Sequence, residues 1–209
     1  MTTASRAVQE SKREEILAAA IRCFAERGYE GTSTREIARE AGAKPPLLFY
    51  HFGSKGDLYL AAVLYQLERL SEALTTALAG VDDDLERLRT FVQVYYDHFT
   101  VHEPGLSVCL RELRVLPRAL GDQIADTHGR VATSVLQRIV ADGIVHGIFR
   151  PFDPWACAYA VTGILQGFMR LRASTQERLG PHAPVQQVLD VYCAGLVAAP
   201  AADRPPYST

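Results

Sequence analysis

The chain has 209 residues, of which 48% are hydrophobic and 22% charged, a size that suits one large domain or a small domain joined to a larger one. Its formal net charge of -2 gives no global attraction to nucleic acid, so any DNA-binding surface must be local. The four cysteines form no CxxC or metal-knuckle pattern, which favours thiols packed as small hydrophobes over a zinc site.

The N-terminal stretch, residues 1–15, is polar and charged and has no apolar segment of the kind that directs export. We therefore expect a cytoplasmic protein with reduced thiols. The first helix is predicted over residues 8–27, because Ile16, Leu17 and Phe24 share one face and Gly28 follows as a helix-ending residue.

Residues 32–52, TSTREIAREAGAKPPLLFYHF, predict two short helices joined by a tight turn. Ser33 lies three residues before Glu36, so its hydroxyl and the Glu36 carboxylate can each cap an amide in the first turn of a helix over 34–41. Gly42 can end that helix with a positive φ. The pattern therefore contains both a helix start and a helix stop.

Proline opens the second of these helices, because Pro45 and Pro46 in the first turn lose only amides that would be unpaired there. Leu48 and Phe52 are four residues apart and are expected to face inward. The bulky side chains between them then point away, which favours a contact surface. A capped helical hairpin inside an all-α core would explain the pattern without any DNA function.

The chain from Ile16 to Leu58 resembles the DNA-binding domain of tetracycline-repressor (TetR) type regulators. The matching residues are Ile16, Phe24, Gly28, Tyr29, Gly31, Thr32, Ser33, Thr34, Ile37, Ala38, Ala41, Gly42, Phe49, Tyr50, His51, Phe52, Ser54, Lys55 and Leu58. The resemblance implies an all-α bacterial regulator of about nine helices. It implies a three-helix helix-turn-helix domain over 1–54 and a larger ligand-binding and dimerisation domain over 55–209.

The resemblance also implies a homodimer that binds double-stranded operator DNA and responds to a small-molecule effector of unknown identity, usually as a repressor. Leu47 stands where the family often has a small polar residue, and it can offer an apolar contact such as one to a thymine methyl group. The residues expected to contact DNA are Thr34, Arg35, Lys44, Pro45, Leu47, Tyr50, His51 and Lys55. Among them Thr34, Arg35 and Lys55 are assigned to phosphates.

Helical patterns continue through the rest of the chain, over 55–79, 85–101, 106–116 and 118–145, and no strand is predicted. Three consecutive aspartates at 82–84 precede one of these helices. We expect them to cap it, because calcium ligands occupy alternate positions.

Residues 154–169 contain no charge, yet this stretch of 16 residues is too short to span a membrane. Ala156, Ala160, Gly163 and Gly167 recur at helical spacing and would let another helix approach closely. We therefore expect the helices over 154–173 and 184–198 to pair with a second copy of the chain.

No motif of an enzyme is present: the sequence lacks GxSxG, GxGxxG and a Walker lysine. No cofactor is expected. His98 and His102 are four apart and could bind a metal with Cys109, although chance spacing explains them as well. The candidate effector contacts are Tyr95, Phe99, Arg111 and Tyr159. Three hypotheses remain open: an effector-responsive regulator, a metal-sensing regulator of the same fold, and a helical partner-binding protein without DNA function.

Overall fold

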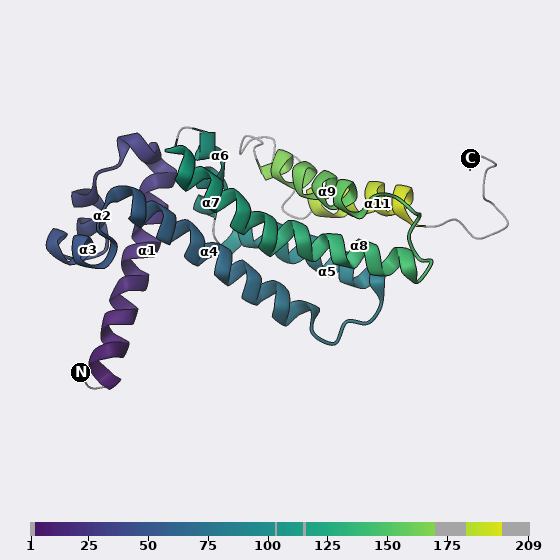
Figure 1. Cartoon of the computed structure of the whole chain (residues 1–209), viewed down its shortest axis with the longest axis horizontal. Helices are drawn as coiled ribbons and strands as arrows, with labels where there is room; N and C mark the ends of the chain where they lie inside the picture. Colours follow the sequence, from purple (N-terminus) through teal and green to yellow (C-terminus); the bar gives the residue numbers. More distant parts are fainter. Residues whose placement is uncertain (1–2, 103, 115, 170–182, 198–209) are drawn as a thin grey trace. The chain divides into compact units, whose positions relative to one another are not determined.

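The computed structural model of the protein describes residues 3–102, 104–114, 116–169 and 183–197. These residues are almost entirely helical, as Figure 1 shows. Within these residues, Phe149 and Val197 form an isolated antiparallel β-bridge. The prediction of an all-α fold is therefore confirmed. By packing, the chain divides into two compact units, residues 1–72 with 97–131 and residues 73–96 with 132–209.

The first unit contains the N-terminal helices, most of α4, and a later group of helices that packs against them. Its elements are α1 (Thr3–Gly31), α2 (Thr34–Glu40), α3 (Pro45–Phe52), most of α4 (Lys55–Leu78), a π-helical turn (His98–His102), α6 (Pro104–Arg111), a 3₁₀ turn (Glu112–Arg114) and α7 (Arg118–His128). Phe24, Ile37, Leu48 and Tyr59 are fully buried in its core. Helix α1 packs against both α2 and α6, so it joins the two groups of helices.

The second unit contains α5 (Asp84–Asp97), α8 (Ser134–Val145), α9 (Pro154–Met169) and α11 (Ala183–Leu196). Helix α9 packs against α8 and α11. The sequence predicts one helix over 118–145, whereas a π-helical turn (Gly129–Thr133) separates α7 from α8. The two predicted dimerisation helices, 154–173 and 184–198, overlap α9 and α11. Residues 170–173 and 198 of these predicted ranges lie outside the described residues, and only the backbone of residue 184 is described.

Two of the three aspartates at 82–84 act at the start of α5, as expected. Asp83 Oδ1 accepts a hydrogen bond from the N–H of Glu86 at 2.9 Å. Asp84 is buried, and its Oδ2 lies 2.6 Å from His146 Nδ1 at the end of α8. Asp83 therefore caps α5, and Asp84 connects α5 to the end of α8.

Candidate nucleic-acid interface

The first turn of α2 is closed by the predicted capping box. Ser33 Oγ accepts a hydrogen bond from the Glu36 N–H at 3.2 Å, and the Glu36 carboxylate accepts one from the Ser33 N–H at 2.9 Å. The hydrogen bonds from Ser33 lower the pKa of the Glu36 carboxyl below its usual value. The carboxylate therefore stays charged and keeps capping the positive end of the helix at neutral pH.

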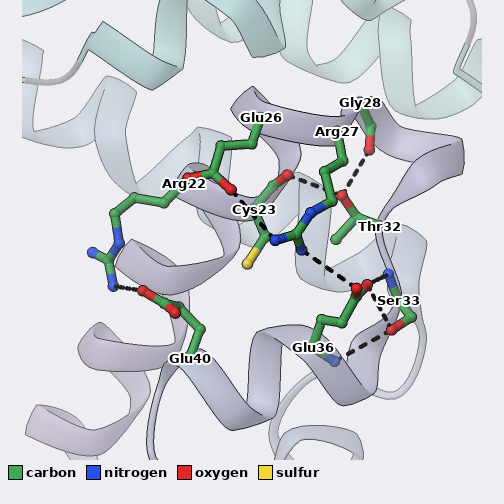
Figure 2. A network of polar contacts seen from close by, with 9 residues as sticks. All are labelled: Arg22, Cys23, Glu26, Arg27, Gly28, Thr32, Ser33, Glu36 and Glu40. Atoms are coloured by element: carbon green, nitrogen blue, oxygen red, sulfur yellow. Dashed lines mark hydrogen bonds and ion pairs between the residues drawn. The ribbon is translucent and has the colours of Figure 1, made fainter.

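Contacts of Thr32 and Arg27 between α1 and the start of α2 fix the position of α2, as Figure 2 shows. The buried Thr32 hydroxyl donates to the carbonyl oxygens of Cys23 and Gly28, at 3.0 and 2.8 Å. Arg27 Nη1 lies 3.5 Å from Glu36 Oε1, so an ion pair adds to the capping box. These contacts hold the start of α2 against the end of α1.

The turn between α2 and α3 is held at its first residue. Gly42 has a φ of +55°, a conformation in which a side chain would be strained. The Lys12 ammonium of α1 donates to the carbonyl oxygen of Ala41 at 2.8 Å, and a cation suits the negative end of a helix. The chain therefore leaves α2 in a fixed direction toward α3.

Helix α3 has one buried face and one exposed face. Leu48 and Phe52 are buried, as the sequence predicts. Tyr50 is 79% exposed, Lys44 and Pro45 are exposed, and Leu47 is half-buried. The expected base-reading residues of α3 are thus open to contact, with the exception of His51.

His51 is half-buried, and its ring packs edge-on against Tyr50 with centroids 5.4 Å apart. Its Nε2 atom is covered and has no hydrogen-bond partner among the described residues. In this conformation His51 cannot donate to a base from Nε2, so a contact to DNA requires its Nδ1 atom or a rotated ring.

The residues expected at phosphates lie at the starts of helices. Arg35 is exposed in the first turn of α2, and Thr34 beside it is half-buried. Lys55 is the first residue of α4, where Ser54 Oγ accepts a hydrogen bond from the Asp57 N–H at 3.1 Å. Free amides and the helix dipole at such starts favour an anion such as a phosphate group.

The four candidate effector contacts are divided between the two units. In the second unit Tyr95 is fully buried and accepts a hydrogen bond from Gln166 Nε2 at 3.4 Å, whereas Tyr159 on α9 is 62% exposed. In the first unit Phe99 is buried and Arg111 is exposed. Each unit therefore holds one buried and one exposed candidate.

Gln66, a buried polar residue that the sequence interpretation did not select, pairs with His98 in the first unit. The Gln66 side-chain oxygen is covered and has no hydrogen-bond partner within the described chain. His98 Nε2 lies 3.1 Å from the backbone carbonyl oxygen of Gln66, and burial lowers the pKa of His98 to about 4. The signal for Gln66 was available, because it interrupts the apolar face of α4 formed by Ala62, Val63, Leu67 and Leu70.

The metal hypothesis required His98, His102 and Cys109 to act together. His98 and Cys109 are buried and His102 is exposed. Over the described parts of the chain, no group of three or more histidine, cysteine or acidic side chains is arranged to hold a metal ion. In the same parts, no helix combines the length and apolar character needed to cross a bilayer.

Two family models match this chain. Residues 16–62 match the model described as "Bacterial regulatory proteins, tetR family", and residues 81–170 match a "Tetracyclin repressor-like, C-terminal domain". Among curated proteins, the chain is 35% identical over 99 residues to the transcriptional activator FasR of Mycolicibacterium smegmatis, covering 47% of this chain and 45% of FasR. It is 38% identical over 82 residues to the transcriptional repressor AcnR of Corynebacterium glutamicum, covering 37% and 44%. These matches span less than half of either relative.

Solved structures match over nearly the whole chain. A regulatory protein of the tetR family from Rhodococcus RHA1 superposes with a TM-score of 0.76 at 29% identity, covering 90% of this chain and 98% of that one. FadR of Bacillus subtilis, solved with stearoyl-CoA, gives a TM-score of 0.77 at 20% identity and shares the fold, covering 87% and 97%. The capped α2, the tight turn and the half-exposed α3 define a helix-turn-helix protein. The chain belongs to the tetR family of bacterial regulatory proteins.

Proposed function

We propose that this protein is a DNA-binding transcription regulator that binds a palindromic operator as a homodimer. The observation that carries the proposal is the two-sided character of α3, which buries Leu48 and Phe52 and exposes Tyr50, with Lys44 exposed at its N-cap. A helix of this kind, held by a capped partner helix, suits insertion into the major groove. We assign the DNA-binding domain to residues 1–54, with Lys55 directly after it as a phosphate contact, and assign no catalytic role to the chain.

The division of labour at DNA follows from the chemistry of the side chains. Lys44 and Tyr50 can donate hydrogen bonds to base edges or to the sugar-phosphate wall, and Leu47 can contact a thymine methyl group. Thr34, Arg35 and Lys55 contact phosphates, which set orientation without reading sequence. His51 is assigned a contact through Nδ1.

The proposed dimer forms through α9 and α11, in the region 55–209 that is assigned to ligand binding and dimerisation. Ala156, Ala160, Gly163 and Gly167 are all exposed on α9, so the stripe of small residues faces outward. A groove of about 720 Å³ lies between α9 and α11 and is lined mostly by apolar side chains, including Ile164. Such a surface supports close packing against the same helices of a second copy.

We propose that a small molecule binds in the larger region and releases the operator, as in a repressor. A donor group on the effector could pair with the unpartnered side-chain oxygen of Gln66. FasR is named an activator and AcnR a repressor, so the direction of control is tested by a promoter reporter with and without the protein. Lower expression that rises with effector supports repression, and expression that needs the protein contradicts it.

The effector can be sought by thermal unfolding with a panel of small molecules. A ligand that binds only the folded state raises the melting temperature, by an amount that grows with the logarithm of its concentration above Kd. Acyl-CoA thioesters belong in the panel, because FadR was solved with stearoyl-CoA. An effector must also weaken operator binding, and a ligand that stabilises the protein without doing so is not the effector.

A further inference from the structure

Helix α1 breaks at Gly28, and a residue far along the chain meets the break. Gly28 has a φ of +73° and a ψ of 172°, outside the helical region. The next residue, Tyr29, donates its backbone N–H to Glu112 Oε2 at 2.9 Å. Glu112 begins the 3₁₀ turn that follows α6. A carboxylate thus accepts a charge-assisted hydrogen bond from the broken end of the first helix.

The absence of a side chain at Gly28 makes room for this carboxylate. A Cβ built on Gly28 would lie 2.6 Å from Glu112 Oε1, closer than non-bonded atoms approach. A side chain there would displace the carboxylate, and the positive φ independently favours glycine. Both features of Gly28 therefore serve the contact between Glu112 and Tyr29.

The segment that carries Glu112 is anchored in the same unit. Helix α6 packs along α1, and the buried Tyr59 hydroxyl of α4 donates to the carbonyl oxygen of Cys109 at 2.9 Å. Glu112 follows Cys109 by three residues, so its backbone is fixed relative to α1 and α4. A fixed carboxylate can then hold Tyr29 in place.

The Tyr29 ring in turn contacts Lys55, the first residue of α4. The Lys55 ammonium lies 4.4 Å from the ring centroid, a cation–π distance. The ring also packs edge-on against Tyr59, with centroids 5.3 Å apart. Glu30 Oε2 lies 4.0 Å from the same ammonium. The direction of the Lys55 side chain therefore depends on where Tyr29 is held.

We propose that Glu112 is a positioning residue for DNA binding: by holding the Tyr29 backbone it fixes the ring that directs the Lys55 ammonium to a DNA phosphate. This inference rests on the proposed function. The inference predicts the direction in which DNA affinity changes when the Glu112 carboxylate is removed. Removing a negative charge by itself strengthens binding to DNA, whereas losing the Lys55 contact weakens it.

The test measures binding of the full-length protein to a short DNA duplex over a range of salt concentrations. Glu112→Ala is expected to weaken binding about 10-fold and to lower the slope of log K against log salt by about 0.9 per subunit, the value for one lost phosphate contact. Glu112→Gln keeps an oxygen acceptor for the Tyr29 N–H and should retain part of the slope. Glu72→Ala is the matched control, since it removes one exposed carboxylate elsewhere and should leave the slope unchanged.

A purely structural role for Glu112 would lower the melting temperature but leave the salt slope of the folded protein as it is. A double-mutant cycle with Lys55→Met separates the two roles. If Glu112 acts through Lys55, Glu112→Ala adds little once Lys55→Met is present. An unchanged slope in Glu112→Ala, or an equal effect in both backgrounds, overturns the inference.

The two proposals fail in different ways. If the unaltered protein shows no salt-dependent DNA binding, the proposed function falls and this inference falls with it. If the unaltered protein binds and Glu112→Ala keeps its affinity and slope, the positioning role alone is wrong.

Discussion

At the scale of single residues, truncating Lys55 and truncating Leu47 are expected to change DNA binding in different ways. Lys55→Ala should weaken specific and random DNA alike and flatten the salt slope by about 0.9 per lost phosphate contact, because the contact proposed for Lys55 is to phosphate alone. Leu47→Ala should keep the slope and relax preference at one base pair per half-site. Salt titrations on operator and random duplexes check both. Loss of sequence preference in Lys55→Ala would contradict the assignment.

His98 provides a second residue-scale prediction, on pH. Burial holds the pKa of His98 at about 4, below the ordinary 6.5, so between these values the unfolded chain binds more protons than the folded one. The contribution of His98 to stability is thus full above about pH 6.5 and falls as the pH drops toward 4, by up to about 1.4 kcal/mol per pH unit. Urea unfolding at several pH values should show a flatter dependence for His98→Gln. An identical dependence would contradict the burial argument.

Residue roles set by local sequence could be predicted, and those set by distant partners could not. Ser33 with Glu36 and Leu48 with Phe52 depend on spacing along one helix, so their capping and burial follow from the sequence. Glu112 lies 83 residues from Tyr29, and no spacing rule relates them. No pattern in the sequence distinguished the exposed Tyr159 from the buried Tyr95.

At the scale of elements, the start of α2 depends on Ser33. Ser33→Ala removes the hydroxyl that accepts from the Glu36 N–H and should reduce the unfolding free energy by about 1 kcal/mol. Ser33→Thr keeps a hydroxyl acceptor and serves as the control. Chemical denaturation followed by circular dichroism measures both. Equal stability of Ser33→Ala and the unaltered protein would show that the capping box contributes nothing.

Helix positions were predicted more reliably than helix continuity. The capping and proline signals place α2, α3 and the start of α4 within a residue or two of the observed bounds. The π-helical turn between α7 and α8 was missed, because its residues, 129–133, contain no proline and Gly129 keeps right-handed helical backbone angles, so the turn changes only the hydrogen-bond pattern.

At the scale of the whole molecule, a bulky substitution among the exposed small residues of α9 tests whether this helix forms the dimer interface. A Cβ built on Gly163 meets nothing within 4 Å, so an arginine there should be accommodated by the single chain and obstruct only a partner. Gly163→Arg should give monomers in sedimentation and lower operator affinity by at least about 100-fold, since two linked half-sites bind far more tightly than one. Gly129→Arg is the control, because Gly129 has similar open space on another element. A Gly163→Arg protein that remains a dimer would place the interface elsewhere.

Footprinting of the purified protein on the DNA upstream of its own gene tests the proposed function most directly. A homodimer that reads the major groove with α3 should protect an inverted repeat whose half-site centres are about 10 base pairs apart or a multiple of that, with protection lost as salt rises. Protection of a single asymmetric site, or of no site at low salt, would contradict the assignment of this chain as a dimeric operator-binding regulator.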